Sequence, residues 1–290
     1  MKFVSKDCNV QNLCIKPGSL GSRFPNIGYG SEGRVYKYDE DTAIKMFDRK
    51  KYPFKLDKIK ELINLKDPNF CFPTGVVYTR NNNLVGYKID LVSNHNNYES
   101  FLELFLEYIP YGLISQEQLM MTLFEIDSAI KRIHKYDYTI GDIRPKNILF
   151  DNEDKPVFID TDSGSYKGYD YDLEYPRLLW AKKVYNKDFS KKDNDIYVWA
   201  VMFLESLLTY NSLNIKNDDY LAIELYQSKK MFDELIKRMN LDKYIKEGLR
   251  EIFSDADNKP YIGDIFKDYV FDKPLINRIP SKILSLKYMR

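Results

Sequence analysis

The sequence predicts an α+β fold of two lobes, a small strand-rich N-terminal lobe with one helix and a larger helical C-terminal lobe. Up to about residue 92, short runs in which apolar and polar residues alternate are typical of half-buried strands. Beyond residue 100, apolar residues recur at helical spacing over longer segments. The polar run SNHNNYES, residues 93–100, separates the two patterns and indicates the break between the lobes.

Short apolar runs bounded by turn residues predict the strands of the first lobe. These runs are RVYKY at 34–38, TAIKMF at 42–47, GVVYT at 75–79 and LVGYKIDL at 84–91. The acidic turn DED precedes the second run, and three consecutive asparagines separate the last two. Between the second and third runs, Leu56, Ile59, Leu62 and Ile63 recur at helical spacing and predict the helix of this lobe.

The second lobe is predicted to be helical with a small β-insert. An amphipathic helix is indicated by the stripe Leu119, Leu123, Ile126, Ile130 and Ile133. The segment IYVWAVMFLESLL, 196–208, is apolar almost all round and predicts a buried helix, and NILF and PVFI between these helices predict two short strands. We therefore divide the chain into an N-lobe at 1–92, a C-lobe at 93–270 and a basic tail at 271–290. The tail is either a docking segment or a solvated terminus.

Composition narrows the range of functions. The 44 basic and 43 acidic residues give a formal charge of +1, which argues against a nucleic-acid partner. No stretch reaches the roughly 18 apolar residues that a membrane span needs. The first residues, MKFVSKDCNV, lack the apolar core of a secretory signal. The 3 cysteines have no metal-site spacing and are expected to be free thiols, so we expect a cytoplasmic protein.

A glycine-rich segment, Gly28-Tyr-Gly30-Ser-Glu-Gly33-Arg-Val35, is the first candidate site. Because glycine has no Cβ, such a segment lets backbone N–H groups approach phosphates closely. A dinucleotide-binding unit would need a helix after the last glycine, whereas RVYKY predicts a strand. We expect the segment to fold over nucleotide phosphates, with an ordinary hairpin turn as the alternative.

Lys45 is the second candidate, because apolar residues flank it in the strand AIKMF. Its ammonium is expected to reach the α- and β-phosphates of a nucleotide, and such a lysine needs a carboxylate to position it. Glu61 on the following helix is the candidate carboxylate, and Asp57, one turn earlier, is the alternative. A solvated strand edge for the lysine and a solvated helix face for either acid are the competing interpretations.

The segment GDIRPKNILF, 141–150, is the most informative. Asp142 and Asn147 lie on one loop that an apolar strand closes, and Asp160 ends the apolar run PVFI. Three oxygen-bearing side chains are therefore expected to converge, and such ligands suit Mg²⁺. Asp142 would accept the proton of an attacking hydroxyl, while Asn147 and Asp160 would hold the metal on ATP phosphates. Taken singly, each of these residues is equally typical of a turn.

Together these segments resemble the eukaryotic-type protein kinase superfamily, as it occurs in bacteria. GYGSEGRV resembles the glycine-rich loop, AIKMF the strand of the nucleotide lysine, GDIRPKNIL the catalytic loop and FIDTDS the metal-binding segment. DNDIYVWAV is similar to the start of the buried central helix, with Asp195 matching its buried aspartate. The matches follow the family's order from residue 28 to about 260, which is most of the chain.

The resemblance implies a bilobal protein-kinase-like fold and a serine/threonine protein kinase that uses ATP and Mg²⁺. Its hinge would be Asp90-Leu91-Val92, behind Ile89 as gatekeeper. The nucleotide-binding set would be Gly28, Gly30, Gly33, Val35, Ala43, Lys45, Glu61, Ile89, Asp90 and Val92. Asp142, Lys45 and Arg144 would be catalytic, and Asn147 and Asp160 would bind the metal. A protein substrate is the expected partner.

Three departures from the family pattern modify this expectation. Ile140-Gly141 stands where most members have His-Arg, so no arginine beside Asp142 receives a phosphorylated loop, and regulation by that phosphate is not expected. Asp-Thr-Asp replaces Asp-Phe-Gly, and Tyr175-Pro176-Arg177 is the nearest match to Ala-Pro-Glu.

Two alternative functions stay open. Small-molecule kinases of the aminoglycoside and choline type resemble this chain in having a glycine before the catalytic aspartate, and a kinase of this type is the first alternative. A pseudokinase binding module is the second alternative.

Overall fold

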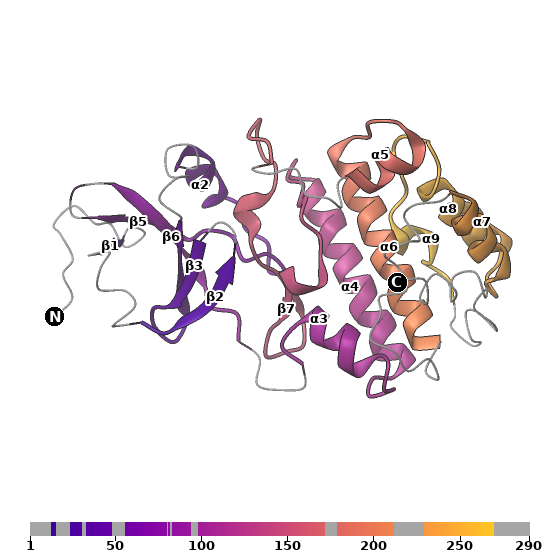
Figure 1. Ribbon diagram of the computed structural model, residues 1–290, viewed down its shortest axis with the longest axis horizontal. Helices are drawn as coiled ribbons and strands as arrows, with labels where there is room; N and C mark the ends of the chain where they lie inside the picture. Colours follow the sequence, from indigo (N-terminus) through magenta and orange to yellow (C-terminus); the bar gives the residue numbers. More distant parts are fainter. Residues whose placement is uncertain are drawn as a thin grey trace, which may run out of the picture.

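The computed structural model describes residues 13–15, 24–30, 33–47, 56–79, 81, 83–93, 98–171, 179–211 and 229–269. The described part is mixed α+β, with a six-stranded sheet formed by the N-terminal part and helices dominating the C-terminal part (Figure 1). The predicted order of elements, strands with one helix followed by helices with a β-insert, is therefore confirmed, and the division into two lobes stays a prediction. The predicted tail at 271–290 and the Tyr175-Pro176-Arg177 segment lie outside the described residues.

The sheet has the strand order β1-β5-β6-β4-β3-β2. Its strands are β1 (Leu13–Ile15), β2 (Asn26–Gly30), β3 (Gly33–Lys37), β4 (Thr42–Phe47), β5 (Gly75–Thr79) and β6 (Leu84–Asp90). Four of them are the predicted runs, and all neighbouring pairs are antiparallel except β1 with β5. β2 begins within a segment that lacks the apolar pattern of a buried strand. It is an exposed edge strand, so its side chains do not have to be apolar.

The helix of the N-terminal part, α2 (Leu56–Leu62), confirms the predicted helical spacing. Its buried side chains are Lys58, Ile59 and Leu62, so one face of the helix packs against the rest of the molecule. The chain then runs along the β-insert, where Cys71 N donates to the carbonyl of Phe158 at 2.8 Å and Phe158 N donates to that of Asn69 at 2.7 Å. These backbone bonds join the N-terminal part to the insert.

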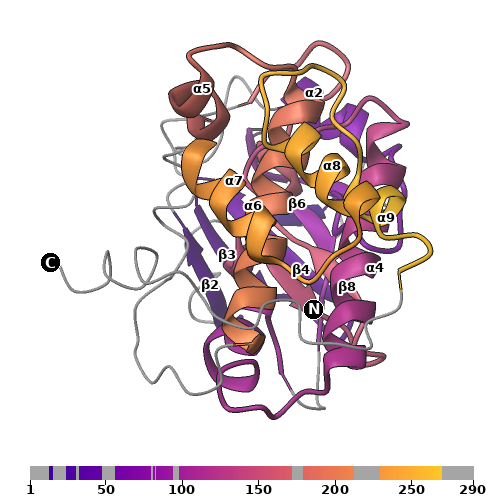
Figure 2. The same cartoon turned by 90° about the vertical axis from the view of Figure 1, so that its right-hand side faces the viewer.

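The helical part packs around two long central helices, α4 (Gln116–His134) and α6 (Lys191–Asn211), which lie side by side (Figures 1 and 2). α4 begins with a capping box, in which Gln118 N donates to Ser115 Oγ at 3.1 Å and Ser115 N donates to Gln118 Oε1 at 3.0 Å. The predicted apolar stripe of α4 is buried throughout, and so is the predicted segment 196–208 of α6. Both helix predictions are therefore confirmed.

Shorter elements complete this part of the chain. They are α3 (Phe101–Glu103), the π-helix η3 (Leu104–Tyr108), α5 (Trp180–Tyr185), α7 (Lys229–Arg238), α8 (Lys243–Ile252) and α9 (Ile262–Ile265). The β-insert is the antiparallel pair β7 (Ile148–Phe150) and β8 (Pro156–Phe158), which lies between the sheet and the central helices (Figure 1). Within the described ranges, no helix is both long and apolar enough to cross a bilayer.

Candidate functional site

The β7–β8 hairpin brings Asn147 and Asp160 to one end of the insert. Ile148 is paired with Phe158, and the carbonyl of Asn147 accepts a hydrogen bond from Ile159 N at 2.9 Å. Asn147 ends the short 3-10 helix η4 (Pro145–Asn147), directly before β7, and Asp160 follows Ile159. The register of the hairpin therefore places these two predicted metal ligands next to each other.

Asp160 adopts a left-handed backbone conformation with φ 61° and ψ 34°. This conformation is uncommon for a residue other than glycine, and such residues often lie at functional sites. The turn that follows, η5 (Thr161–Ser163), is anchored on several sides. Thr161 Oγ1 donates to the carbonyl of Cys71 at 2.8 Å, Tyr138 Oη donates to the carbonyl of Thr161 at 2.7 Å, and Ser163 Oγ donates to the carbonyl of Asp160 at 2.7 Å. Asp160 is thus held in this conformation by its neighbours.

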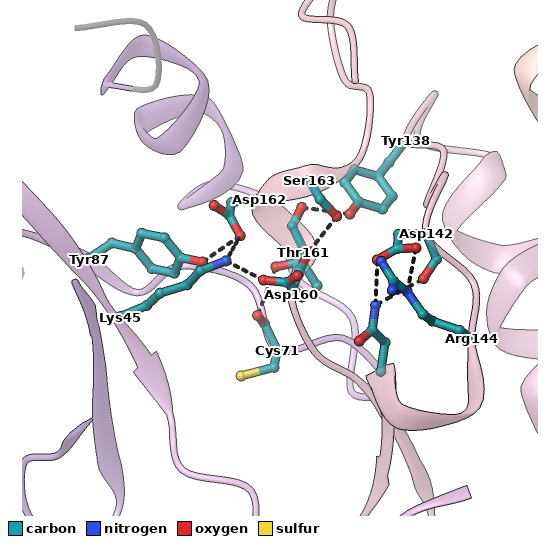
Figure 3. Close-up of polar contacts among 11 residues, drawn as sticks. Lys45, Cys71, Tyr87, Tyr138, Asp142, Arg144, Asp160, Thr161, Asp162 and Ser163 are labelled. Carbon is teal, nitrogen blue, oxygen red and sulfur yellow. Dashed lines mark hydrogen bonds and ion pairs between the residues drawn. The ribbon is translucent and has the colours of Figure 1, made fainter. Parts of the chain in front are cut away.

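Lys45 lies on β4, and its buried ammonium points toward this turn (Figure 3). It forms an ion pair with Asp160 and a second with Asp162, whose Oδ1 lies 2.6 Å from Lys45 Nζ. Asp162 Oδ1 also accepts a hydrogen bond from Tyr87 Oη at 2.6 Å. Lys45 is therefore part of an interior ionic cluster, and the competing interpretation of it as a solvated edge lysine is wrong.

The predicted pairing of Lys45 with Glu61, or with Asp57, is wrong. Glu61 is paired instead with Lys167, at 2.8 Å between Nζ and Oε2, and Asp57 is exposed with Lys60 Nζ 3.9 Å away. The reason is the orientation of α2. The helix face that carries Ile59 and Leu62 is turned to the interior, and Lys58 lies on this same face. The inward polar residue of this helix is therefore a cation. The spacing of Ile59 and Leu62 was the sequence signal for this orientation.

Asp142 is held by two side chains of its own loop. Arg144 donates from Nε to Asp142 Oδ1 at 2.6 Å and from Nη2 to Oδ2, which makes a two-pronged contact. Asn147 Nδ2 donates to Asp142 Oδ2 at 2.9 Å and to its carbonyl at 3.0 Å. A carboxylate can accept about four hydrogen bonds, so Asp142 keeps capacity for a hydroxyl donor. These contacts fix the orientation of the carboxylate and bring together three of the predicted site residues. Figure 3 shows Arg144 against Asp142.

The backbone before Asp142 is fixed by Asp195, which lies buried at the start of α6. Its carboxylate accepts hydrogen bonds from Ile140 N at 2.7 Å and Gly141 N at 2.9 Å. His134 Nε2 lies 3.0 Å from the same carboxylate, and Tyr261 Oη lies 3.0 Å from His134 Nδ1. Asp195 thus links the loop of Asp142 to the central helices, so the loop has a rigid support.

Gly141 has a positive φ of 75°, and a Cβ at this position would lie 2.5 Å from the ring of Tyr171. Gly141→Ala is therefore expected to destabilise the fold by about 2–4 kcal/mol, because left-handed strain of about 1–2 kcal/mol adds to overpacking. Thermal denaturation measures the loss. Gly168→Ala is the matched control, because Gly168 has a φ of 84° and a Cβ added there would have nothing within 4 Å. Equal losses in the two variants would contradict the contact with Tyr171.

The segment that follows η5 is held by lysines. Lys191 Nζ donates to Ser165 Oγ at 2.8 Å and lies 2.7 Å from Asp170 Oδ1. The hydrogen bond with Lys191 is the main cause that lowers the pKa of Asp170 below its ordinary value. Lys58 Nζ donates to the carbonyl of Asp170 at 3.2 Å. Lys58 of α2 and Lys191 of α6 therefore hold the described part of this segment, up to residue 171. Independence of the activity from a phosphate group stays a prediction.

The glycine-rich segment forms two paired strands. β2 and β3 pair antiparallel with Gly30 opposite Gly33, and the two residues between them lie outside the described ranges. A strand follows the last glycine, as predicted, so the arrangement differs from a dinucleotide-binding unit. A Cβ on Gly33 would lie 1.9 Å from the carbonyl oxygen of Met46 on β4, so close packing of strands requires that glycine. Gly28 has room for a side chain, and its contact with phosphate stays a prediction.

Val35, Ala43, Ile89 and Asp90, four of the other predicted nucleotide residues, lie on the same sheet as Lys45. Val35 is opposite Lys45 in the β3–β4 register, and Ala43 is opposite Ile89 in the β4–β6 register. β6 ends at Asp90, whose carbonyl accepts a hydrogen bond from Cys71 Sγ at 3.2 Å, and Val92 lies two residues further on. Burial raises the pKa of the Cys71 thiol to about 12, so this cysteine is an unreactive neighbour of the predicted hinge.

The oxygen ligands suit a hard cation that also binds phosphate oxygens. Asp160 keeps 33% of its side chain exposed, and Asn147, which carries an amide oxygen, is joined through its carbonyl to Ile159, the residue before Asp160. Among the described residues, no three His, Cys, Asp or Glu side chains gather as a metal-binding group. A site with these two ligands fits Mg²⁺, which usually takes one or two protein ligands and completes its shell with water and substrate phosphates.

No protein-family model matches the chain.

Proposed function

We propose that the chain is an ATP- and Mg²⁺-dependent phosphotransferase with a protein-kinase-like fold, and that it is a serine/threonine protein kinase. The observation that carries this proposal is the meeting of Lys45 and Asp160 beside the loop of Asp142 and Asn147. A cation from the sheet, a partly exposed carboxylate and a fixed catalytic carboxylate are the groups that phosphoryl transfer needs. The order of the sheet, α2, the β-insert and the central helices also supports the kinase-like fold.

The proposed roles follow from where the side chains lie. Lys45 offers its ammonium to the α- and β-phosphates, and Asp160 and Asn147 would hold Mg²⁺, which supplies charge neutralisation at the phosphates. Asp142 orients the acceptor hydroxyl and takes its proton as the oxygen forms its bond to the γ-phosphorus. The bond between that phosphorus and the bridging oxygen breaks, and ADP leaves with the electron pair. Arg144 keeps the carboxylate of Asp142 in place and adds positive charge beside the transferred group.

A small-molecule kinase is the second candidate, because a glycine directly before the catalytic aspartate, here Gly141, also resembles kinases of the aminoglycoside and choline type. The ring of Tyr171 occupies the space beside Gly141, with its hydroxyl 3.1 Å from Thr139 Oγ1. The acceptor would then be a small alcohol and not a protein hydroxyl. The chemistry at Asp142 would be the same in both cases, so the destination of the phosphoryl group separates them.

Incubation with γ-labelled ATP and Mg²⁺ tests the proposal, with a generic protein substrate in one arm and small hydroxyl compounds in the other. We expect label on serine or threonine of a protein, either the added substrate or the chain itself. Label on a small compound alone would identify the second candidate. Absence of label and of ADP in every arm would overturn the enzymatic proposal and favour the pseudokinase.

A further inference from the structure

Asp162 is fully buried, with 0% of its side chain exposed, and it lies in contact with Lys45. We propose that Asp162 is the residue that positions Lys45 for nucleotide, the role that the sequence pattern predicted for Glu61. This inference rests on the proposed function. It assigns to the second aspartate of Asp-Thr-Asp a task separate from that of Asp160, the proposed metal ligand.

Three elements meet at the carboxylate of Asp162. Lys45 on β4 and Tyr87 on β6 are direct partners in the sheet, and Asp162 lies in η5 (Figure 3). Lys45 Nζ and Tyr87 Oη each lie 2.6 Å from Asp162 Oδ1, and the ammonium is 5.8 Å from the centroid of the Tyr87 ring. Both donors approach from the sheet, so Asp162 fixes the direction in which the lysine extends.

The two aspartates differ in their access to solvent. Asp160 is partly exposed and is accessible to a metal ion that binds phosphate, whereas Asp162 is enclosed. When Asp160 turns to a metal ion, Asp162 remains as a carboxylate that holds the ammonium. A buried charge pair of this kind requires both partners, because removal of one leaves the other charge without compensation.

α2 offers no carboxylate for this task. Its inward side chains are Lys58, Ile59 and Leu62, and Glu61 pairs with Lys167 at its more exposed side. Asp160 and Asp162 lie on one turn, which Thr161 anchors to the carbonyl of Cys71. Metal binding and lysine positioning therefore depend on the same turn.

Calorimetric titration of the full chain with MgATP tests this role through a set of variants. Asp162→Asn is expected to raise the Kd by about 10- to 100-fold, because it removes charge-assisted bonds. Tyr87→Phe removes one hydrogen bond to the same carboxylate and should raise the Kd by about 2- to 10-fold. Glu61→Gln is the matched carboxylate control, and it should alter the Kd by less than about twofold, because its ion pair is exposed.

A double-mutant cycle with Lys45→Met separates positioning from general stability. If Asp162 acts through Lys45, Asp162→Asn should change the Kd by less than about twofold once Lys45 is replaced. Equal effects of Asp162→Asn in both backgrounds would overturn the proposal. Recovery of wild-type affinity in Asp162→Asn at high Mg²⁺ would also overturn it, because that result would make Asp162 a metal ligand.

Further outcomes keep this inference distinct from the proposed function. If the wild type binds MgATP and Glu61→Gln weakens binding while Asp162→Asn does not, the inference fails and the function stands. If the wild type does not bind MgATP, the proposed function fails and the inference fails with it. Thermal denaturation of every variant is the control for folding. Where Asp162→Asn does not fold, Tyr87→Phe combined with Lys45→Met provides the same cycle.

Discussion

Asp142→Asn is expected to reduce phosphoryl transfer by about 100- to 10,000-fold and to leave the Kd for MgATP within about threefold of the wild-type value. The carboxylate of Asp142 is held by Arg144 and Asn147, on the side proposed to take the acceptor, and Lys45 contacts other carboxylates. Loss of the proton acceptor therefore affects the chemical step more than nucleotide binding. Turnover with labelled ATP and calorimetric titration with MgATP measure the two effects.

The control for this variant is Asp257→Asn, an aspartate whose side chain is 60% exposed and which pairs with Lys187 at 2.8 Å. It should retain wild-type turnover, because an exposed ion pair contributes little to the fold and lies outside the proposed site. Wild-type activity in Asp142→Asn would exclude Asp142 as the base. A parallel loss of MgATP binding would show that Asp142 acts on the nucleotide and not on the acceptor.

Asp160→Asn is expected to abolish transfer and, unlike Asp142→Asn, to weaken MgATP binding by about 10-fold or more. The substitution removes a proposed charged metal ligand, which is also a carboxylate that contacts Lys45. The distinguishing signature is the Mg²⁺ titration, in which the variant should need a higher Mg²⁺ concentration than the wild type for half-maximal nucleotide binding. An unchanged Mg²⁺ dependence in Asp160→Asn would remove Asp160 from the metal site.

Much of the scaffold was predictable, because it depends on local periodicity. The apolar runs at 42–47 and 84–91, the stripe of α4 and the buried α6 all correspond to the elements observed. The proximity of Asn147 and Asp160 was also predictable, since two short apolar runs flank them and pair as β7 and β8. In each case the apolar pattern that predicts the element lies within one segment or within two neighbouring segments of the chain.

The partners of the site residues were less predictable, because they depend on tertiary packing. The choice between Glu61 and Asp162 as the partner of Lys45 depends on which face of α2 turns inward and on the conformation at Asp160. The ring of Tyr171 beside Gly141 comes from a different segment of the chain. β1 pairs in parallel with β5, a partner far along the sequence that no local pattern indicates.

The most direct test of the central claim is a crystal structure of the chain with Mg²⁺ and a non-hydrolysable ATP analogue. We expect Mg²⁺ bound by Asn147 and Asp160, the ammonium of Lys45 on the α- and β-phosphates, and the γ-phosphate facing Asp142. Lys45 should still contact Asp162 in that complex. A nucleotide bound elsewhere, or Lys45 directed into solvent with nucleotide present, would contradict the account.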